Sequence, residues 1–321
     1  MRNRRDRRAG HKIVVHITNR VVCGMPFTPK LYMRQMIKGI LARGQYLYPV
    51  QIVSVQFMGN HYHIILAGRA SMISPFMNYI DGQIAAALKE LCPMYRNHSK
   101  IWKGRFKEQR LVTAEAVINM LVYVYANPVQ AGLVRELEDY PGFNTFKMHR
   151  DGSHKLEVPV VPRSSYMKHK AKLESMGTEE HAEFVKKNHK TIAEFRLSPD
   201  VWKNSFEESK DWSSEYIFNR IQEGVKEVEQ SSKKTIAKTV GRRALLKQSR
   251  HKYYEPKKKP GDRTPFLVCD DTELRIAEIS SYRRFCDQCR EAWARMKKWG
   301  KRVRFPRGAY MPGSPFLMQP G

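Results

Sequence analysis

The chain has 321 residues, of which 58 are Lys or Arg and 31 are Asp or Glu, so its formal net charge is +27. Basic residues exceed acidic ones in both halves of the chain, which is typical of proteins that bind a polyanion such as nucleic acid. Hydrophobic residues make up 41% of the sequence, too many for a disordered chain. No apolar run reaches the roughly 20 residues of a membrane-spanning helix, which excludes an integral membrane protein.

Basic residues crowd the first ten positions of the chain. We interpret residues 1–10 as a basic arm that reaches DNA; the alternative is a solvated tail with unspecific charge attraction. No apolar stretch follows this arm, so we expect no secretory signal, and five scattered cysteines predict a reducing cytosol instead of a disulfide framework. The arginines of the arm are Arg2, Arg4, Arg5, Arg7 and Arg8.

Residues 11–150 show a regular succession of strand and helix signals. The order β-α-β-β-α-β with an added helix is that of a split βαβ, so we predict an α+β, ferredoxin-like fold with an antiparallel sheet. Helices would cover one face and leave the other for substrate or for the added helix. The predicted elements are a strand at 11–22, a helix that Thr28 and Pro29 begin and Gly44 ends, strands at 50–57 and 61–66, a helix from Ser74, a strand at 106–112 and a helix at 113–127.

Beyond residue 150 the pattern becomes mainly helical. A stretch from Thr235 resembles a helix-turn-helix in which Arg242 and Arg243 begin a DNA-contacting helix; the alternative is one more basic helical segment. The predicted parts are a linker at 151–170, a basic helical region at 171–254, a Lys- and Pro-rich linker at 255–265, and a long helix with a Pro-rich tail at 266–321.

Two histidines stand two residues apart in the predicted hairpin. His61 and His63 therefore point to one side of the strand, whereas Tyr62 points to the other side and can enter the core. Two neutral imidazoles on one face form half of a site for a divalent metal ion. The alternative is a pair of histidines that hydrogen bonds satisfy on a half-exposed strand.

A polar stripe runs along the otherwise apolar helix at 113–127. Asn119, Tyr123 and Asn127 are spaced four residues apart and share one face. Tyr125 lies about 200° around the helix from Tyr123, on the side that should pack on the sheet. The stripe indicates either a functional tyrosine at position 123 or an ordinary amphipathic boundary.

Three motifs together resemble those of a known family. They are His-Tyr-His at 61–63, Trp-Lys-Gly-Arg-Phe at 102–106 and Tyr-Val-Tyr-Ala-Asn-Pro-Val-Gln-Ala-Gly-Leu-Val at 123–134. In this order and spacing they resemble the REP-associated tyrosine transposases, relatives of the single-strand insertion-sequence transposases in the HUH endonuclease superfamily. The resemblance covers residues 10–150. It departs from the family at Gly59, where a proline is common.

The resemblance implies a metal-dependent transposase whose catalytic domain is residues 11–150. His61 and His63 would bind Mg²⁺ or Mn²⁺, and Asn127 would supply a further polar ligand. Tyr123 would attack the scissile phosphate and leave a 5′-phosphotyrosine and a free 3′-hydroxyl, so the strand could be rejoined without ATP. Because a free tyrosine has a pKa of ~10, we expect local positive charge to favour its ionisation.

The implied substrate is single-stranded or hairpin DNA, including palindromic repeats. A monomer or homodimer would act on it at the nucleoid, in a bacterial cytoplasm. Unpaired bases stack on aromatic rings while basic side chains follow the phosphates, so Trp102 and Arg105 are candidate DNA contacts. The alternative is that Trp102 and Phe106 anchor the fourth strand in the core.

Three other functions remain open. A non-catalytic nucleic-acid binder could have the same fold, although the paired aromatics of an RNA-recognition motif are missing from the predicted central strands. A two-histidine phosphoesterase would need a second histidine motif, and the later histidines show no repeat of the first. A replication initiator or relaxase shares the chemistry, but the short spacing from the histidine pair to one tyrosine favours a transposase.

Overall fold

The computed structural model describes residues 12–24, 30–173, 175–248, 265–299 and 303–309. The strands are β1 (Lys12–Arg20), β2 (Val50–Phe57), β3 (His61–Arg69), β4 (Lys107–Leu111), β5 (Lys155–Val160), β6 (Thr191–Arg196) and β7 (Leu267–Val268). The α-helices are α1 (Leu31–Leu47), α2 (Ala70–Leu91), α3 (Pro93–Arg96), α4 (Ala114–Gln130), α5 (Phe146–Arg150), α6 (Arg163–Lys168), α7 (Lys170–Leu173), α8 (Thr178–Asn188), α9 (Ser214–Thr235), α10 (Arg242–Lys247) and α11 (Thr272–Trp299).

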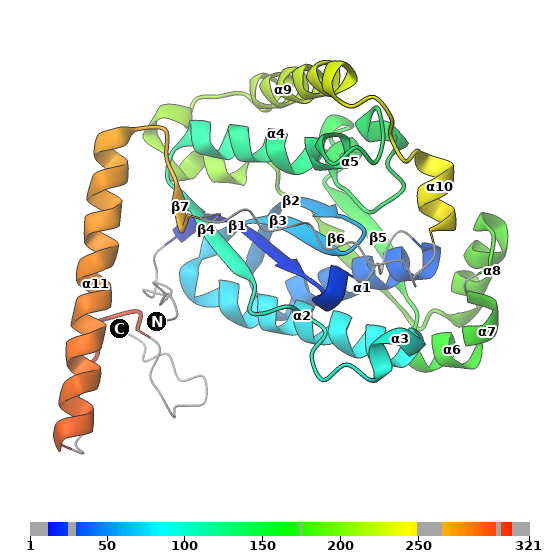
Figure 1. Cartoon of the computed structure of the whole chain (residues 1–321), viewed down its shortest axis with the longest axis horizontal. Coiled ribbons are helices and arrows are strands. Elements are labelled where there is room, and N and C mark those ends of the chain that lie inside the picture. The colour runs from blue at the N-terminus through cyan, green and yellow to red at the C-terminus, as the bar shows by residue number, and fades with distance from the viewer. Residues whose placement is uncertain (1–11, 25–29, 174, 249–264, 300–302, 310–321) are drawn as a thin grey trace.

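Five strands form the main sheet in the order β2-β3-β1-β4-β7 (Figure 1). β1 pairs antiparallel with both β3 and β4, and β2 pairs antiparallel with β3. The predicted α+β class, the order of the first four strands along the chain and their antiparallel pairing are therefore confirmed. β7 lies parallel to β4 and is a fifth strand that the sequence did not predict.

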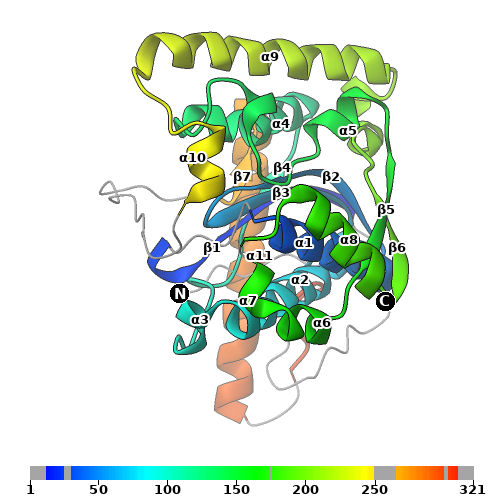
Figure 2. The ribbon, with the colours of Figure 1, turned by 90° about the vertical axis from the view of Figure 1, so that its right-hand side faces the viewer.

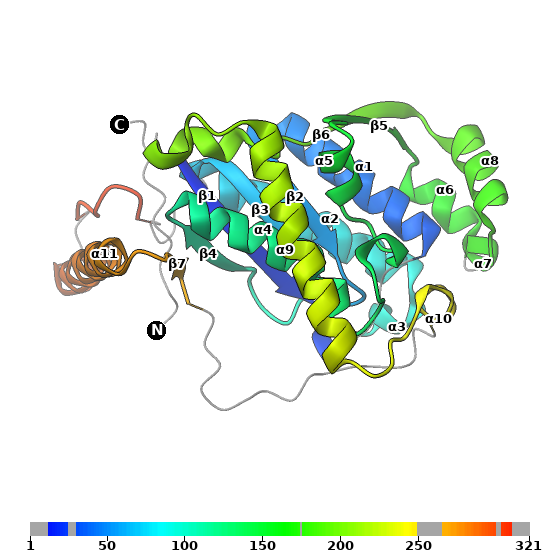
Figure 3. The same ribbon diagram turned by 90° about the horizontal axis from the view of Figure 1, so that it is seen from above.

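Alternation of side chains along the strands gives the sheet two apolar faces. In β1, Val15 and Ile17 face the core under α1 and α2, whereas Val14 belongs to the core under α4. α9 lies across the outer side of α4, so the layers are α1 with α2, the sheet, α4 and α9 (Figure 1, Figure 3). The added helix, α4, thus covers the second face.

Gly44 lies inside α1 and does not end it. A Cβ atom at this position would come within 2.8 Å of Ile80 Cδ1 and 3.0 Å of Phe76 Cε2 on α2, so the missing side chain allows the two helices to approach closely. α1 continues to Leu47. The prediction that Gly44 ends the helix was wrong because a glycine at a helix contact and a glycine at a helix end look alike in sequence.

Residues 151–170 do not form the predicted linker. They contain β5 and α6, and Val158 and Tyr166 are buried in the core beside α1 and α2. β5 pairs with β6 in a separate two-stranded sheet that contacts α1 (Figure 2). Pro159 lies in this small sheet and Pro162 directly precedes α6, and both positions tolerate a proline.

The last described elements are β7 and α11. α11 agrees with the long helix predicted within 266–321 and stands at the side of the main body (Figure 1). The second predicted linker, 255–265, lies almost wholly outside the described residues, as does most of the Pro-rich tail. No helix in the described part of the chain is both long and apolar enough to cross a membrane.

Candidate active site

The two histidines of the motif come from β3, which lies between β2 and β1. His61 and His63 point to the α4 side of the sheet, and the centroids of their rings are 5.1 Å apart. Tyr62 is fully buried in the core on the opposite face. The predicted common face of the two histidines is therefore confirmed, with His63 buried and His61 partly exposed.

α4 brings a tyrosine to these histidines. Thr113 caps the helix, because its side-chain oxygen accepts a hydrogen bond from the Ala116 backbone N–H. Tyr123 is 40% exposed, and its ring stands edge-on to the His63 ring with the centroids 5.5 Å apart. Tyr125 is fully buried on another side of the helix. The structure thus brings Tyr123, and not Tyr125, to the histidine pair, as the helical spacing predicts.

The surroundings of Tyr123 act on its pKa in opposite directions. Partial burial raises the pKa, whereas the polar side chain of Asn127 and the positive charge of Arg20 lower it. Burial outweighs the other two, so the pKa lies above its ordinary value and the phenol is protonated at neutral pH. The predicted positive charge is present as Arg20, but its effect on the pKa of Tyr123 is smaller than that of burial.

The histidines are neutral at physiological pH. Burial, with a further contribution from the charge of Arg20, lowers the pKa of His61 to about 3. The pKa of His63 is well below its usual range, because burial and the neighbouring His16, His61 and Arg20 all disfavour the imidazolium. Neutral imidazoles carry a free lone pair, so these rings are suited to bind a cation and not to act as acids.

A third histidine, His16 of β1, joins the pair. Its Nε2 is 2.9 Å from His63 Nδ1, and the two rings are nearly parallel with their centroids 5.2 Å apart. Its Nδ1 is 2.9 Å from Gln109 Oε1 on β4. Neither His16 nor Gln109 was predicted from the sequence. The available signal was a polar residue in the middle of an apolar strand, because His16 stands between Val and Ile and is buried.

The segment that follows α3 passes beside this end of the sheet. The Lys103 backbone N–H donates to the Arg20 carbonyl oxygen at 2.8 Å, and Arg20 is paired with His61 across β1 and β3. Arg105 lies two residues further and is exposed. This predicted DNA contact is therefore on the surface at the histidine end of β3.

Trp102, the other predicted contact of this segment, packs against the core. Its indole N–H donates to the Asp81 carbonyl oxygen at 2.8 Å, and its ring stands edge-on to Tyr62 with the centroids 5.5 Å apart. Phe106 is buried in the same core. These contacts favour the alternative in which Trp102 and Phe106 anchor the start of β4.

No protein-family model matches the chain. Over 112 aligned residues it is 28% identical to a Haemophilus influenzae protein provisionally named a REP-associated tyrosine transposase, across 32% of this chain and 62% of the relative. The chain resembles REP-associated tyrosine transposases. It spans about three fifths of the length of that relative. A solved structure of a REP-associated tyrosine transposase bound to a REP hairpin aligns with 48% of this chain and 86% of that chain, at 22% identity and a TM-score of 0.38.

The resemblance to tyrosine transposases implies a metal ion at His61, His63 and Asn127, and the side chains can be tested for fit. His63 Nε2 is buried and has no hydrogen-bond partner in the described structure. Asn127 is one turn after Tyr123 on α4, and its side chain is near enough to lower the pKa of the Tyr123 hydroxyl. No group of three His, Cys, Asp or Glu side chains converges on one point among the described residues. Two imidazoles and one amide oxygen would thus form a partial shell, which phosphate oxygens and water could complete.

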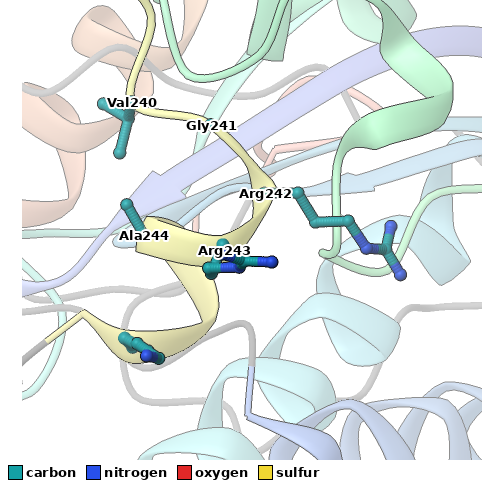
Figure 4. Close-up of a pocket in the computed structure, with 6 residues that line it drawn as sticks. Val240, Gly241, Arg242, Arg243 and Ala244 are labelled. Atoms are coloured by element: carbon teal, nitrogen blue, oxygen red, sulfur yellow. The ribbon is translucent and has the colours of Figure 1, made fainter.

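Arg242 and Arg243 begin α10, but no helix directly precedes them. After α9 ends, residues 236–241 form a loop whose last two N–H groups donate to the carbonyl oxygens of Gly132 and Leu133, just beyond α4. The predicted helix-turn-helix was therefore wrong, because tertiary contacts with the end of α4 hold this segment extended. Figure 4 shows Arg242 pointing away from α10, at the edge of a shallow pocket on the surface.

Two basic side chains of α1, Arg34 and Lys38, line a second pocket, and Arg34 is near enough to Arg242 for the two charges to interact. Burial lowers the pKa of Arg34, and the charge of Arg242 lowers it further; Lys38 is affected in the same way by burial and by Arg34. None of these three cations forms an ion pair with an acidic residue in the described part of the chain. The arginines of the predicted arm lie outside the described residues; they are Arg2, Arg4, Arg5, Arg7 and Arg8.

Proposed function

We propose that the chain is a tyrosine transposase that cleaves and rejoins single-stranded or hairpin DNA, and that its first four strands form a ferredoxin-like catalytic fold. The observation that carries the proposal is the position of Tyr123, whose partly exposed ring stands edge-on to the His63 ring with the centroids 5.5 Å apart. Elements far apart in the sequence supply these groups. The similarity to REP-associated tyrosine transposases supports the same assignment.

Tyr123 would act as the nucleophile. Its Oη would form a bond to the scissile phosphorus as the bond from phosphorus to the 3′ oxygen breaks, giving a 5′-phosphotyrosine. The phenol proton would pass to solvent, and the departing 3′ oxygen would take up a proton to become a hydroxyl. Because one phosphate diester replaces another, attack by a 3′-hydroxyl would rejoin the strand without ATP.

Asn127 and the histidines would prepare this step. The Asn127 side chain, which acts on the pKa of Tyr123, would orient the Tyr123 hydroxyl, and the neutral His61 and His63 rings would offer lone pairs beside it. Mg²⁺ or Mn²⁺ held by His61, His63 and Asn127 would polarise the phosphate as a Lewis acid. Because burial raises the pKa of Tyr123, the phenol would lose its proton during the attack and not before it.

The charge of the protein supports a DNA substrate. The net charge of +27 attracts a polyanion, and Arg34, Lys38 and Arg242, whose contacts are with carbonyl oxygens and an aromatic ring and not with carboxylates, would contact phosphates. Arg105 would do so at the histidine end of β3. Single-stranded or hairpin DNA, with its flexible backbone, could reach Tyr123 between these contacts.

A denaturing gel with end-labelled hairpin DNA and Mg²⁺ or Mn²⁺ tests the proposal. Wild type should give a slowly migrating covalent adduct. Tyr123→Phe removes one oxygen and should abolish the adduct, whereas the matched Tyr125→Phe should keep it. His61→Ala and His63→Ala should lose cleavage and keep DNA binding. An adduct in Tyr123→Phe would overturn the mechanism, and DNA binding by wild type with no adduct would point to a non-catalytic binder.

A further inference from the structure

The hydrogen bonds of His16 have only one consistent direction. Gln109 Oε1 is a carbonyl oxygen and can only accept, so His16 Nδ1, 2.9 Å away, carries the proton. A neutral imidazole then has its lone pair on the other nitrogen, so His16 Nε2 accepts from His63 Nδ1–H, also at 2.9 Å. His63 therefore has its proton on Nδ1 and its lone pair on Nε2.

The Nε2 atom of His63 is the end of this chain of hydrogen bonds. It is buried and has no hydrogen-bond partner in the described structure, and an unpartnered buried polar atom is costly. The Tyr123 ring stands next to the same imidazole. The lone pair is therefore available at the place where the reacting groups meet.

We propose that His16 and Gln109 are positioning residues that hold His63 in its Nδ1–H tautomer and so present Nε2 to a divalent cation, a role that rests on the proposed function. His16 and Gln109 are directly opposite each other in the register of β1 and β4. The His16 ring also lies at only 4° to the His63 ring, which restricts its rotation. The sheet therefore sets the orientation of His63, as the hydrogen-bond partners of metal-binding histidines do in known metal sites.

His61 has the same Nδ1–H tautomer as His63, but different hydrogen-bond partners determine it. Its Nδ1 is 2.8 Å from Asn60 Oδ1, and the Asn60 amide nitrogen donates to the Gly24 carbonyl oxygen at 3.0 Å, so the amide oxygen is the end that faces the ring. His61 Nδ1 is then the protonated atom, and its Nε2 carries the lone pair. Two unrelated sets of partners thus produce the same tautomer in both histidines of the motif.

Nuclear magnetic resonance of the full, metal-free chain tests the tautomer directly. Long-range ¹H–¹⁵N correlations of ¹⁵N-histidine-labelled protein distinguish Nδ1–H from Nε2–H. We expect Nδ1–H for His63 in wild type and in Gln109→Glu, which keeps an acceptor, and a shift of population toward Nε2–H in Gln109→Leu, which has none. An Nε2–H tautomer in wild type, or an unchanged population in Gln109→Leu, would overturn the inference.

Titration with Mn²⁺, followed by the electron paramagnetic resonance of the free ion, gives a second readout. His16→Phe keeps a flat ring but loses the acceptor, so Mn²⁺ should bind roughly 10–100-fold more weakly. His16→Gln has an oxygen that can accept from His63 and should stay close to wild type. Equal Mn²⁺ affinity in His16→Phe and wild type would refute the positioning role, and if His16→Phe does not fold, the two Gln109 variants decide.

The two proposals can fail separately. A wild-type chain with Nδ1–H His63 and Mn²⁺ binding that depends on His16, but with no DNA adduct, would refute the proposed function and leave the positioning role standing. A wild-type chain that forms the adduct while His16→Phe binds Mn²⁺ normally would refute only the positioning role.

Discussion

Replacing Gly224 with alanine should weaken the contact between α9 and α4. A Cβ atom at Gly224 would lie 2.7 Å from Val122 Cγ2 and 3.0 Å from Cγ1, well inside the ~3.5–4.0 Å of an ordinary carbon contact. Valine is stiff at χ1 in a helix, so its methyl groups cannot turn away. The helices would have to separate, and such overpacking costs about 1–3 kcal/mol.

Alanine also has a better helix propensity than glycine, by about 1 kcal/mol, which must be separated from the clash. Gly82 provides the matched control, because it lies inside α2 and no atom comes within 4 Å of the position of its Cβ. Gly82→Ala should therefore raise the free energy of unfolding by up to about 1 kcal/mol. The free energy of unfolding of Gly224→Ala should be about 1–3 kcal/mol lower than that of Gly82→Ala.

Urea denaturation followed by tryptophan fluorescence measures these differences, and a double-mutant cycle with Val122→Ala isolates the contact. Removing the two methyl groups of Val122 makes room for the new Cβ, so the double variant should be more stable than the sum of the single variants predicts. If Gly224→Ala is as stable as Gly82→Ala, or if the cycle shows no coupling, the close approach of α9 to α4 at this point is refuted.

Two further predictions concern protons and salt. Burial lowers the pKa of His16 to about 4, whereas a histidine in the unfolded chain has a pKa of ~6.5, so the unfolded chain takes up this proton first as the pH falls. The free energy of unfolding should therefore fall between pH 6.5 and pH 4, by up to about 1.4 kcal/mol per pH unit for this group. Urea midpoints measured against pH should give a flatter profile in His16→Gln than in wild type. The double variant Arg242→Gln, Arg243→Gln should reduce the slope of log Kd for single-stranded DNA against log salt concentration by about 1.4. The control is Lys186→Gln, Lys187→Gln on α8, where the two lysines are also exposed, and it should leave the slope unchanged. Equal slopes in the two double variants would exclude Arg242 and Arg243 from the DNA-binding surface.

The sheet and its two main helices could be predicted because their signals are local. Alternating apolar residues mark β1, a two-residue spacing places His61 and His63 on one face of a strand, and the same spacing on a helix turns Tyr123 and Tyr125 to different sides. These are properties of a strand or helix taken alone. The structure agrees with the sequence wherever the periodicity of one element decides the outcome.

What could not be predicted depends on partners distant in the sequence. His16 becomes part of the site only because β1 lies between β3 and β4, which places His63 and Gln109 on either side of it. β5 is a short strand, and three helices separate it in sequence from its partner β6. The prolines in and after β5 therefore predicted a linker, because nothing nearby in the sequence indicated the pairing. Residues 236–241 are extended because they pair with the end of α4.

The outer side of α4 is covered by α9, which comes much later in the chain. During synthesis at ~5–20 residues per second, α4 would wait on the order of ten seconds for this cover. A nascent chain thus contains His61, His63 and Tyr123 before α9 can cover the outer side of α4. The helix that carries Tyr123 therefore receives its outer apolar layer, from Ile217 to Val225, only after more than two thirds of the chain has been synthesised.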